Sequence, residues 1–178
     1  DARLQTMRDA TEGVLRAIYA GDADKVAGML GETYIQHNPF AQDGAQPLID
    51  FVRKGANEGW LNRDAALLFD PLRTVAEGDL AATHYLDRGE GKVYIDIFRF
   101  DEDLKIVEHW DVAQEWAGWN KSGRSMIDGA GDPTAEISKD QLEAHKAAVR
   151  RLMDVYFDQG DASVVPEIVG ETYFQHNP

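Results

Sequence analysis

The feature that most constrains the fold is a run of four β-strand patterns joined by short polar turns in the middle of the chain. Each run is rich in β-branched and aromatic residues, and each connection is a short segment of Gly, Asp and Glu, which is typical of hairpins. We expect strands at 65–76, 80–88, 92–100 and 104–116. Pro71 interrupts the first strand and indicates a bulge or an edge position. The pattern predicts an antiparallel meander.

Helical patterns precede the meander. Apolar residues at helical spacing predict a helix over 3–20 and a shorter one over 23–30, which Asp22 can cap. A short strand over 33–37 and a third helix with Pro47 in its first turn follow. Helices first and strands afterwards indicate an α+β fold, in which a curved antiparallel sheet wraps over three helices.

The end of the chain repeats its beginning. Residues 21–39, GDADKVAGMLGETYIQHNP, and 160–178, GDASVVPEIVGETYFQHNP, share most of their residues at a constant offset of 139. We therefore predict a domain over 1–119, a linker over 120–137, and a partial second copy over 138–178 with two helices and one strand. This copy lacks its own meander, so it would pack on the first domain, pair with another chain, or be part of a truncated tandem protein. We favour the last origin.

Composition limits the partners and the location. The net charge is −14, and nucleic acids and anionic membranes both require basic surface, so neither is an expected partner. The chain has no cysteine, no apolar run near the ~20 residues of a membrane span, and no signal-peptide pattern at its start. We expect a cytoplasmic protein.

The best candidate for chemistry is the last strand of the meander, LKIVEHWDVAQEW. Side chains alternate between the faces of a strand, so His109 and Asp111 share one face, with Cα atoms roughly 6–7 Å apart. Both can reach one small molecule. The alternative is that this face of the sheet is wetted and has no function.

These residue types suit proton transfer next to a carbonyl group. Burial in an apolar pocket raises the pKa of a carboxylate in general and suits it to act as a base, the role we expect for Asp111, while histidines can donate hydrogen bonds to the enolate. His109 is the nearest donor, and His37 and His84 are further candidates. Tyr94, Phe98, Phe100 and Trp60 would line an apolar pocket for a small hydrophobic molecule. Such catalysis requires no metal and no cofactor, and no metal-ligand spacing is present.

Three candidates also have a structural interpretation. His37 can simply end a strand before Asn38-Pro39, and its recurrence at His176 is equally explained by duplication of a structural motif. His84 alternates with Ala82 and Leu86, so we expect it to face inward, as a core residue or a site residue. Asp96 lies between aromatic residues and is either a site group or the partner of a histidine.

The motifs YIQHNP (34–39), DIFRF (96–100) and KIVEHWDV (105–112), in this order of elements, resemble the SnoaL-like polyketide cyclases of the nuclear transport factor 2-like superfamily. The resemblance implies a cone-shaped barrel that encloses a pocket and often forms a homodimer through its sheet. It also implies that an Asp on the last strand acts as acid and base in an aldol cyclisation, a role that falls to Asp111 here.

The sequence therefore predicts a cofactor-free lyase or isomerase of the polyketide cyclase type. The alternatives are a non-catalytic module that binds a small ligand, a dimerisation module, and a hydrolase that activates water.

Overall fold

A computed structural model describes residues 1–129 and 137–178 of the chain. These residues form two compact units. The first comprises residues 1–118 and 125–129, and the second comprises residues 119–124 and 137–178. The segment that we expect to be a linker contributes to both units, and its residues 130–136 lie outside the described residues.

The three helices predicted for the first unit are confirmed. Helix α1 (Ala2–Tyr19) begins at Asp1, whose side chain accepts the backbone N–H of Arg3. Helix α2 (Ala23–Met29) begins at Asp22, which caps it through the N–H of Lys25. Helix α3 (Ala45–Glu58) ends at Gly59, which has a left-handed φ of 82° that glycine adopts without steric strain.

The meander is also confirmed. Strands β2 to β5 pair antiparallel in chain order, and a fifth strand, β1, adds to β5 in parallel, so the sheet order is β1-β5-β4-β3-β2. The bounds of the strands are β1 Leu30–Gln36, β2 Phe69–Glu77, β3 Leu80–Asp87, β4 Lys92–Phe100 and β5 Ile106–Glu115. Pro71 lies on the edge strand β2, next to a register shift, as predicted. The first residues of predicted strand 65–76 instead form a 3-10 turn, η1 (Ala65–Leu67).

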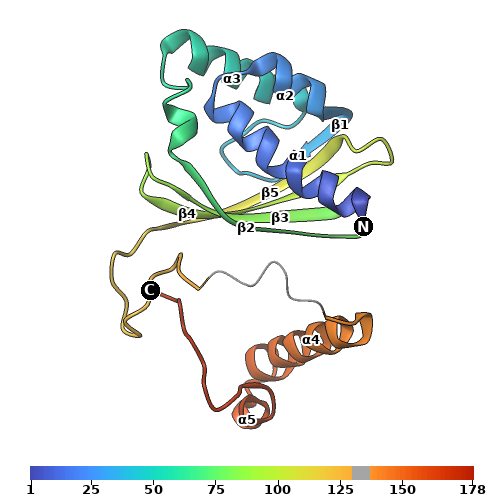
Figure 1. Cartoon of the computed structure of the whole chain (residues 1–178), viewed down its shortest axis with the longest axis vertical. Coiled ribbons are helices and arrows are strands. Elements are labelled where there is room, and N and C mark those ends of the chain that lie inside the picture. The colour runs from blue at the N-terminus through green and yellow to red at the C-terminus, as the bar shows by residue number, and fades with distance from the viewer. Residues whose placement is uncertain (130–136) are drawn as a thin grey trace. The chain divides into compact units, whose positions relative to one another are not determined.

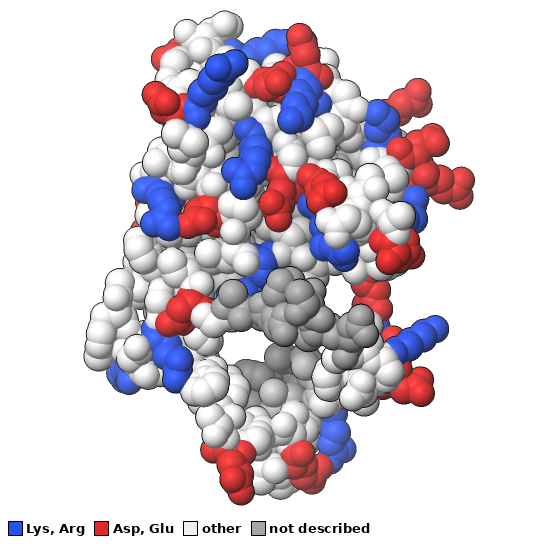
Figure 2. Space-filling view, in the orientation of Figure 1, with Lys and Arg blue, Asp and Glu red and all other residues white. Residues whose placement is uncertain are grey.

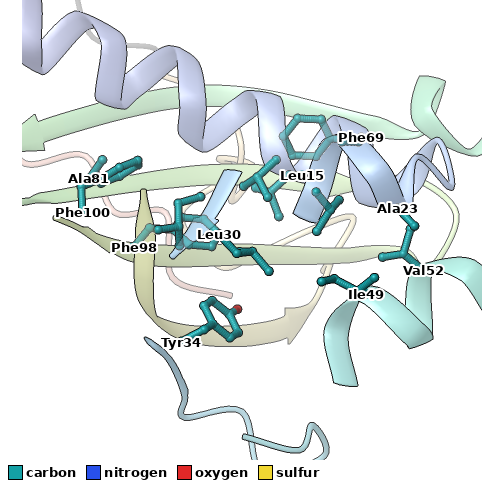
Figure 3. Close-up of a cluster of buried hydrophobic side chains, with 14 of the residues drawn as sticks. Leu15, Ala23, Leu30, Tyr34, Ile49, Val52, Phe69, Ala81, Phe98 and Phe100 are labelled. Atoms are coloured by element: carbon teal, nitrogen blue, oxygen red, sulfur yellow. The ribbon is translucent and has the colours of Figure 1, made fainter. Parts of the chain in front are cut away.

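Helices α1, α2 and α3 cover one face of the sheet (Figure 1). The core lies between them, and Leu15 of α1, Val52 of α3, and Phe98 and Phe100 of β4 belong to one cluster of buried side chains (Figure 3). Register shifts between Leu30 and Ile35 and between Arg99 and Phe100 interrupt the ladders around β5. Such bulges bend a sheet, and this curvature leaves room under the helices.

The surface carries both signs of charge. Asp and Glu side chains are interspersed with Lys and Arg over the face of the molecule shown in Figure 2. Among the described residues, no helix combines the length and the apolar character that a bilayer span requires.

The second unit contains the helices of the predicted partial copy. Helix α4 (Lys139–Leu152) starts with the predicted capping box, in which Ser138 and Gln141 exchange hydrogen bonds. A π-helical turn η2 (Met153–Asp158), a 3-10 turn η3 (Ala162–Val164) and helix α5 (Val165–Ile168) follow. Residues 169–175, which correspond to strand β1 of the first copy, form neither helix nor strand.

The π-helical turn has a counterpart in the sequence repeat. From Gly21 onward the two copies align at an offset of 139, but the apolar residues of the preceding helix align at 138, so that Leu15 corresponds to Met153 and Ile18 to Tyr156. The second copy therefore holds one extra residue between its helix and the shared block. A π-turn contains one residue more than an α-turn and accommodates this insertion at η2.

Candidate functional site

A cavity of about 1050 Å³ lies inside the first unit, between the helices and the concave face of the sheet. This is large enough for a drug-sized molecule. Most of its wall is apolar, from α1, α3 and the segment that follows α3: Leu15, Ile18, Leu48, Phe51, Trp60, Leu61 and Leu68. A smaller set of polar side chains comes from the end of β1 and from β3, β4 and β5.

The cavity opens to solvent between aromatic side chains. Phe40, Phe51 and Trp60 border it and are 97%, 49% and 44% exposed. The rings of Phe51 and Trp60 meet edge to face, with their centroids 5.1 Å apart. A large exposed apolar rim is typical of a ligand entrance rather than of a closed core. Trp60 therefore lies at the cavity, as the sequence predicts, and specifically at its mouth.

Asp111 lies on the cavity wall, on the concave face of β5. One of its carboxylate oxygens, Oδ2, accepts a hydrogen bond of 2.7 Å from the side-chain amide of Asn38. Asn38 is itself held in a turn, because its Oδ1 accepts the backbone N–H of Phe40. The carboxylate is therefore oriented by a neutral donor and has no basic partner among the described ion pairs, so it is available as a proton acceptor.

His109 also borders the cavity, but its two nitrogens point at other groups. The ring atom Nδ1 is 2.9 Å from Oε1 of Gln36, and the same Oε1 accepts the backbone N–H of Asn38 at 3.0 Å. Since Oε1 is an acceptor in both contacts, Nδ1 of His109 carries the proton. The other nitrogen, Nε2, is buried and has no hydrogen-bond partner. His109 therefore presents a ring face to the cavity and offers it no free donor, which is contrary to our expectation of a hydrogen bond to the enolate.

Asp96 is opposite Asp111 on the neighbouring strand β4, but lies beneath the cavity wall. It is 3% exposed, one oxygen accepts the hydroxyl of Tyr85 at 3.2 Å, and the other is 3.8 Å from Nε2 of His109. Burial raises the pKa of Asp96, while His109 lowers it and the charge of Asp111 raises it further. The structure thus places Asp96 behind the site, as the partner of a histidine, and not on the cavity wall.

Two tyrosines form a second polar group nearer the β3–β4 turn. Tyr19 donates a hydrogen bond of 2.5 Å to buried Asp87, and Tyr94 donates one of 2.7 Å to Glu90. Burial, followed by the neighbouring carboxylate, raises the pKa of both phenols. Both tyrosines therefore stay protonated at neutral pH. Tyr94 lines the cavity, as predicted.

Besides Asp96, four residues that the sequence predicts at the pocket do not line this cavity: His37, His84, Phe98 and Phe100, the last of which is buried in the core. His37 lies on the convex face of the sheet, stacked on Trp110 with centroids 4.9 Å apart, and its Nε2 is 2.8 Å from Glu108. Its backbone N–H pairs with the carbonyl of His109, so His37 ends the strand, which is the structural interpretation. Phe98 is a core residue, stacked under His109 with centroids 4.7 Å apart.

His84 is also on the convex face, so the prediction that it faces inward was wrong. Its Nδ1 accepts a hydrogen bond of 2.8 Å from Arg73, and it borders a separate hollow of about 220 Å³. Burial, followed by the charge of Arg73, lowers the pKa of His84. His84 does share a face of β3 with Ala82 and Leu86, as predicted. Near this end, however, β3 has buried residues on both faces, so an apolar neighbour such as Leu86 does not show which face of the sheet is concave.

Sequence reasoning missed the two residues that hold the site, Gln36 and Asn38. The signal was present, because side chains alternate along a strand. Residues 34, 36 and 38 share one face, and Tyr34, Gln36 and Asn38 all recur in the second copy. His37, which the sequence analysis selected, points to the opposite face.

Among the described residues, no group of three or more His, Asp or Glu side chains is arranged to hold a metal ion. The polar side chains of the site contact one another: Gln36 bonds to His109, Asn38 bonds to Asp111, and His109 faces Asp96. The site has the residue types of proton-transfer chemistry.

Residues 11–109 match the model of the SnoaL-like domain family. The chain belongs to this family. The match ends at His109, two residues before Asp111, so the role of Asp111 must be argued from its position on β5.

Several solved structures are similar to this chain. An NTF-2 like protein of unknown function from Burkholderia xenovorans is 21% identical, with 65% of this chain and 90% of that chain covered and a TM-score of 0.49. A steroid delta-isomerase from Pseudomonas aeruginosa is 18% identical, with 66% and 82% covered and a TM-score of 0.43. The epoxide hydrolase/cyclase-like enzyme SalBIII, which acts in pyran ring formation in the polyether salinomycin, is 15% identical, with 62% and 92% covered and a TM-score of 0.44. A search of curated proteins found no match.

Proposed function

We propose that this SnoaL-like protein catalyses cofactor-free proton transfer on a small hydrophobic carbonyl compound, in an isomerisation or an aldol cyclisation. The observation that supports this most is the position of Asp111. Its carboxylate lies on the wall of an apolar cavity of about 1050 Å³ and is oriented by the amide of Asn38 at 2.7 Å. A carboxylate with a neutral donor and an apolar surrounding is a better base than one paired with Lys or Arg.

In the proposed reaction, Asp111 removes a proton from the carbon next to the substrate carbonyl. The electrons of the broken C–H bond form the C=C bond of the enolate, and the carbonyl π-electrons move to its oxygen. In an isomerisation, the protonated Asp111 returns the proton to a different carbon of the conjugated system. In an aldol cyclisation, the enolate carbon attacks a second carbonyl of the same molecule, and Asp111 gives the proton to the new alkoxide.

The enolate oxygen requires a hydrogen-bond donor at the cavity wall. The amide of Asn38 has two N–H groups, one of which is bonded to Asp111. We assign the second N–H of Asn38 to the enolate oxygen. This pairing places the base and the donor side by side, which suits a carbonyl carbon and its neighbouring C–H group.

The test is hydrogen–deuterium exchange at the carbon next to the carbonyl, followed by NMR in D2O with 1-tetralone, 2-tetralone and methyl 2-naphthoylacetate as probes. Exchange requires only the first chemical step and not the natural substrate. We expect wild-type protein to accelerate exchange of at least one probe above the buffer rate. Asp111→Asn should lower that acceleration by about 100-fold or more, because it removes the base.

The matched control is Glu108→Gln. Glu108 is on the same strand, but its carboxylate pairs with Arg99 and His37 on the convex face. The same acid-to-amide change there should leave exchange within about twofold of wild type, as for a surface substitution. Equal exchange by wild type and Asp111→Asn would contradict the proposal. Tight binding of a probe, seen as quenching of Trp fluorescence, without any exchange would favour the non-catalytic ligand-binding alternative.

A further inference from the structure

Asp96 and His109 form a buried pair, and the position of one proton between Oδ1 of Asp96 and Nε2 of His109 has to be assigned. The side chains are 4% and 12% exposed, and Oδ1 of Asp96 is 3.8 Å from Nε2 of His109. Nδ1 of His109 donates to Gln36, so in a neutral ring Nε2 has only a lone pair. A buried lone pair without a donor is unfavourable, and Asp96 is the group that faces it.

The surroundings of Asp96 do not favour an isolated negative charge. Its other oxygen accepts the hydroxyl of Tyr85, and no Lys or Arg pairs with it among the described ion pairs. The titratable groups that face it are His109 and Asp111 on β5, Tyr85 on β3 and Tyr34 on β1. Burying an unpaired, charged carboxylate in such a place carries a desolvation penalty of roughly several kcal/mol. Protonation or an opposite charge removes this penalty.

We propose that Asp96 is a positioning residue that shares one proton with His109, so that the pair stays neutral beside the base Asp111. The proton lies on Asp96 or on Nε2, and the net charge of the pair is zero in both arrangements. Burial, which raises the pKa of Asp96, agrees with this assignment.

Neutrality of the pair matters to Asp111. Asp111 is two residues from His109 on the same face of β5, and its register partner is Asp96. A lone imidazolium there would stabilise the charged form of Asp111 and weaken it as a base, whereas a lone Asp96 carboxylate would disfavour that charged form by repulsion. A neutral pair avoids both effects. The catalytic part of this inference rests on the proposed function, but the shared proton does not.

The experiment is 15N NMR of the histidine rings between pH 5 and 8, with the His109 signals identified by their loss in His109→Gln. In wild-type protein we expect Nε2 to have a shift between the protonated and unprotonated values, and to change little with pH, since the pair keeps its proton. In Asp96→Asn the carboxyl is gone, and Nε2 should move to the unprotonated position at pH 8. A wild-type Nε2 that titrates as an ordinary histidine would overturn the proposal, and this result is read on the wild-type protein, with His109→Gln used only to assign the signals.

The exchange assay adds a second readout. Asp96→Ala removes the group that faces Nε2, and the displaced ring should lower exchange on the order of tenfold. Asp96→Asn keeps a neutral donor of the same shape and should restore exchange to within about threefold of wild type. Equal loss in both variants would show that the carboxyl has another role. If wild type catalyses no exchange while the NMR result holds, then the proposed function fails and the shared proton stands.

Discussion

The chain contains the motif Tyr-x-Gln-His-Asn-Pro twice, and the two copies have the same local structure but different surroundings. In the first copy, Nε2 of Gln36 donates to the hydroxyl of Tyr34 at 3.3 Å. In the second, Nε2 of Gln175 donates to the hydroxyl of Tyr173 at 3.4 Å. The side chain of the glutamine is thus oriented in the same way in both copies.

The second local contact is also shared. The backbone N–H of Asn38 donates to Oε1 of Gln36 at 3.0 Å, and that of Asn177 donates to Oε1 of Gln175 at 3.1 Å. These bonds span two residues, so the motif itself is sufficient to form them.

The difference lies in the long-range contacts. In the first copy the motif continues a strand that pairs with β5, and there Gln36 holds His109 while Asn38 holds Asp111. In the second copy the motif is largely exposed and belongs to no strand. The motif itself orients the two amide side chains, but the site also requires His109 and Asp111, which only the neighbouring strand β5 supplies. Variants at matching positions of the two copies test this comparison.

The largest expected difference is between Leu15→Ala in helix α1 and Met153→Ala at the corresponding position of the second copy, in the turn η2. Leu15 is 5% exposed in the core and Met153 is 48% exposed. Leu15→Ala should lower the free energy of unfolding by about 2–5 kcal/mol, because it leaves a cavity. Met153→Ala should change it by less than about 0.5 kcal/mol. Urea unfolding measures both, and an equal loss would mean that the second helix is buried in solution.

The next difference is between Gln36→Ala and Gln175→Ala. The first variant leaves Nδ1 of His109 and the N–H of Asn38 without their acceptor, which should lower the free energy of unfolding by about 1–3 kcal/mol. The second variant removes an exposed side chain and should have almost no effect. A small effect of Gln36→Ala would indicate that water replaces the amide.

The smallest expected difference in stability is between Asn38→Ala and Asn177→Ala. Loss of the bond from Asn38 to Asp111 should lower the free energy of unfolding by about 1 kcal/mol, since the carboxylate can regain water from the cavity. The exchange assay should be more sensitive, because the proposed base and its donor both depend on Asn38. Asn177→Ala serves as the control and should match wild type in both measurements, whereas a fall in exchange there would link the second copy to the site.

Much of the fold could be predicted from local patterns. Helical spacing and caps marked α1, α2, α3 and α4, and the alternation of β2 to β5 marked the meander, including the irregularity at Pro71. The prediction that Asp111, Tyr94 and Trp60 face one cavity also followed from these patterns. The parallel pairing of β1 with β5 could not be predicted, because it joins segments about 70 residues apart.

The amino-acid sequence by itself determined which side chains share a face of each strand, where helices begin, and the local bonds of the Tyr-x-Gln-His-Asn-Pro motif, because these depend on residues only a few positions apart. The tertiary structure decided which face is concave, and therefore that Asn38 lies at the cavity while His37 and His84 do not. It also placed Asp96 behind His109, beneath the wall. These outcomes depend on how the sheet bends and on which strand β1 pairs with, and both are set by packing of the whole unit.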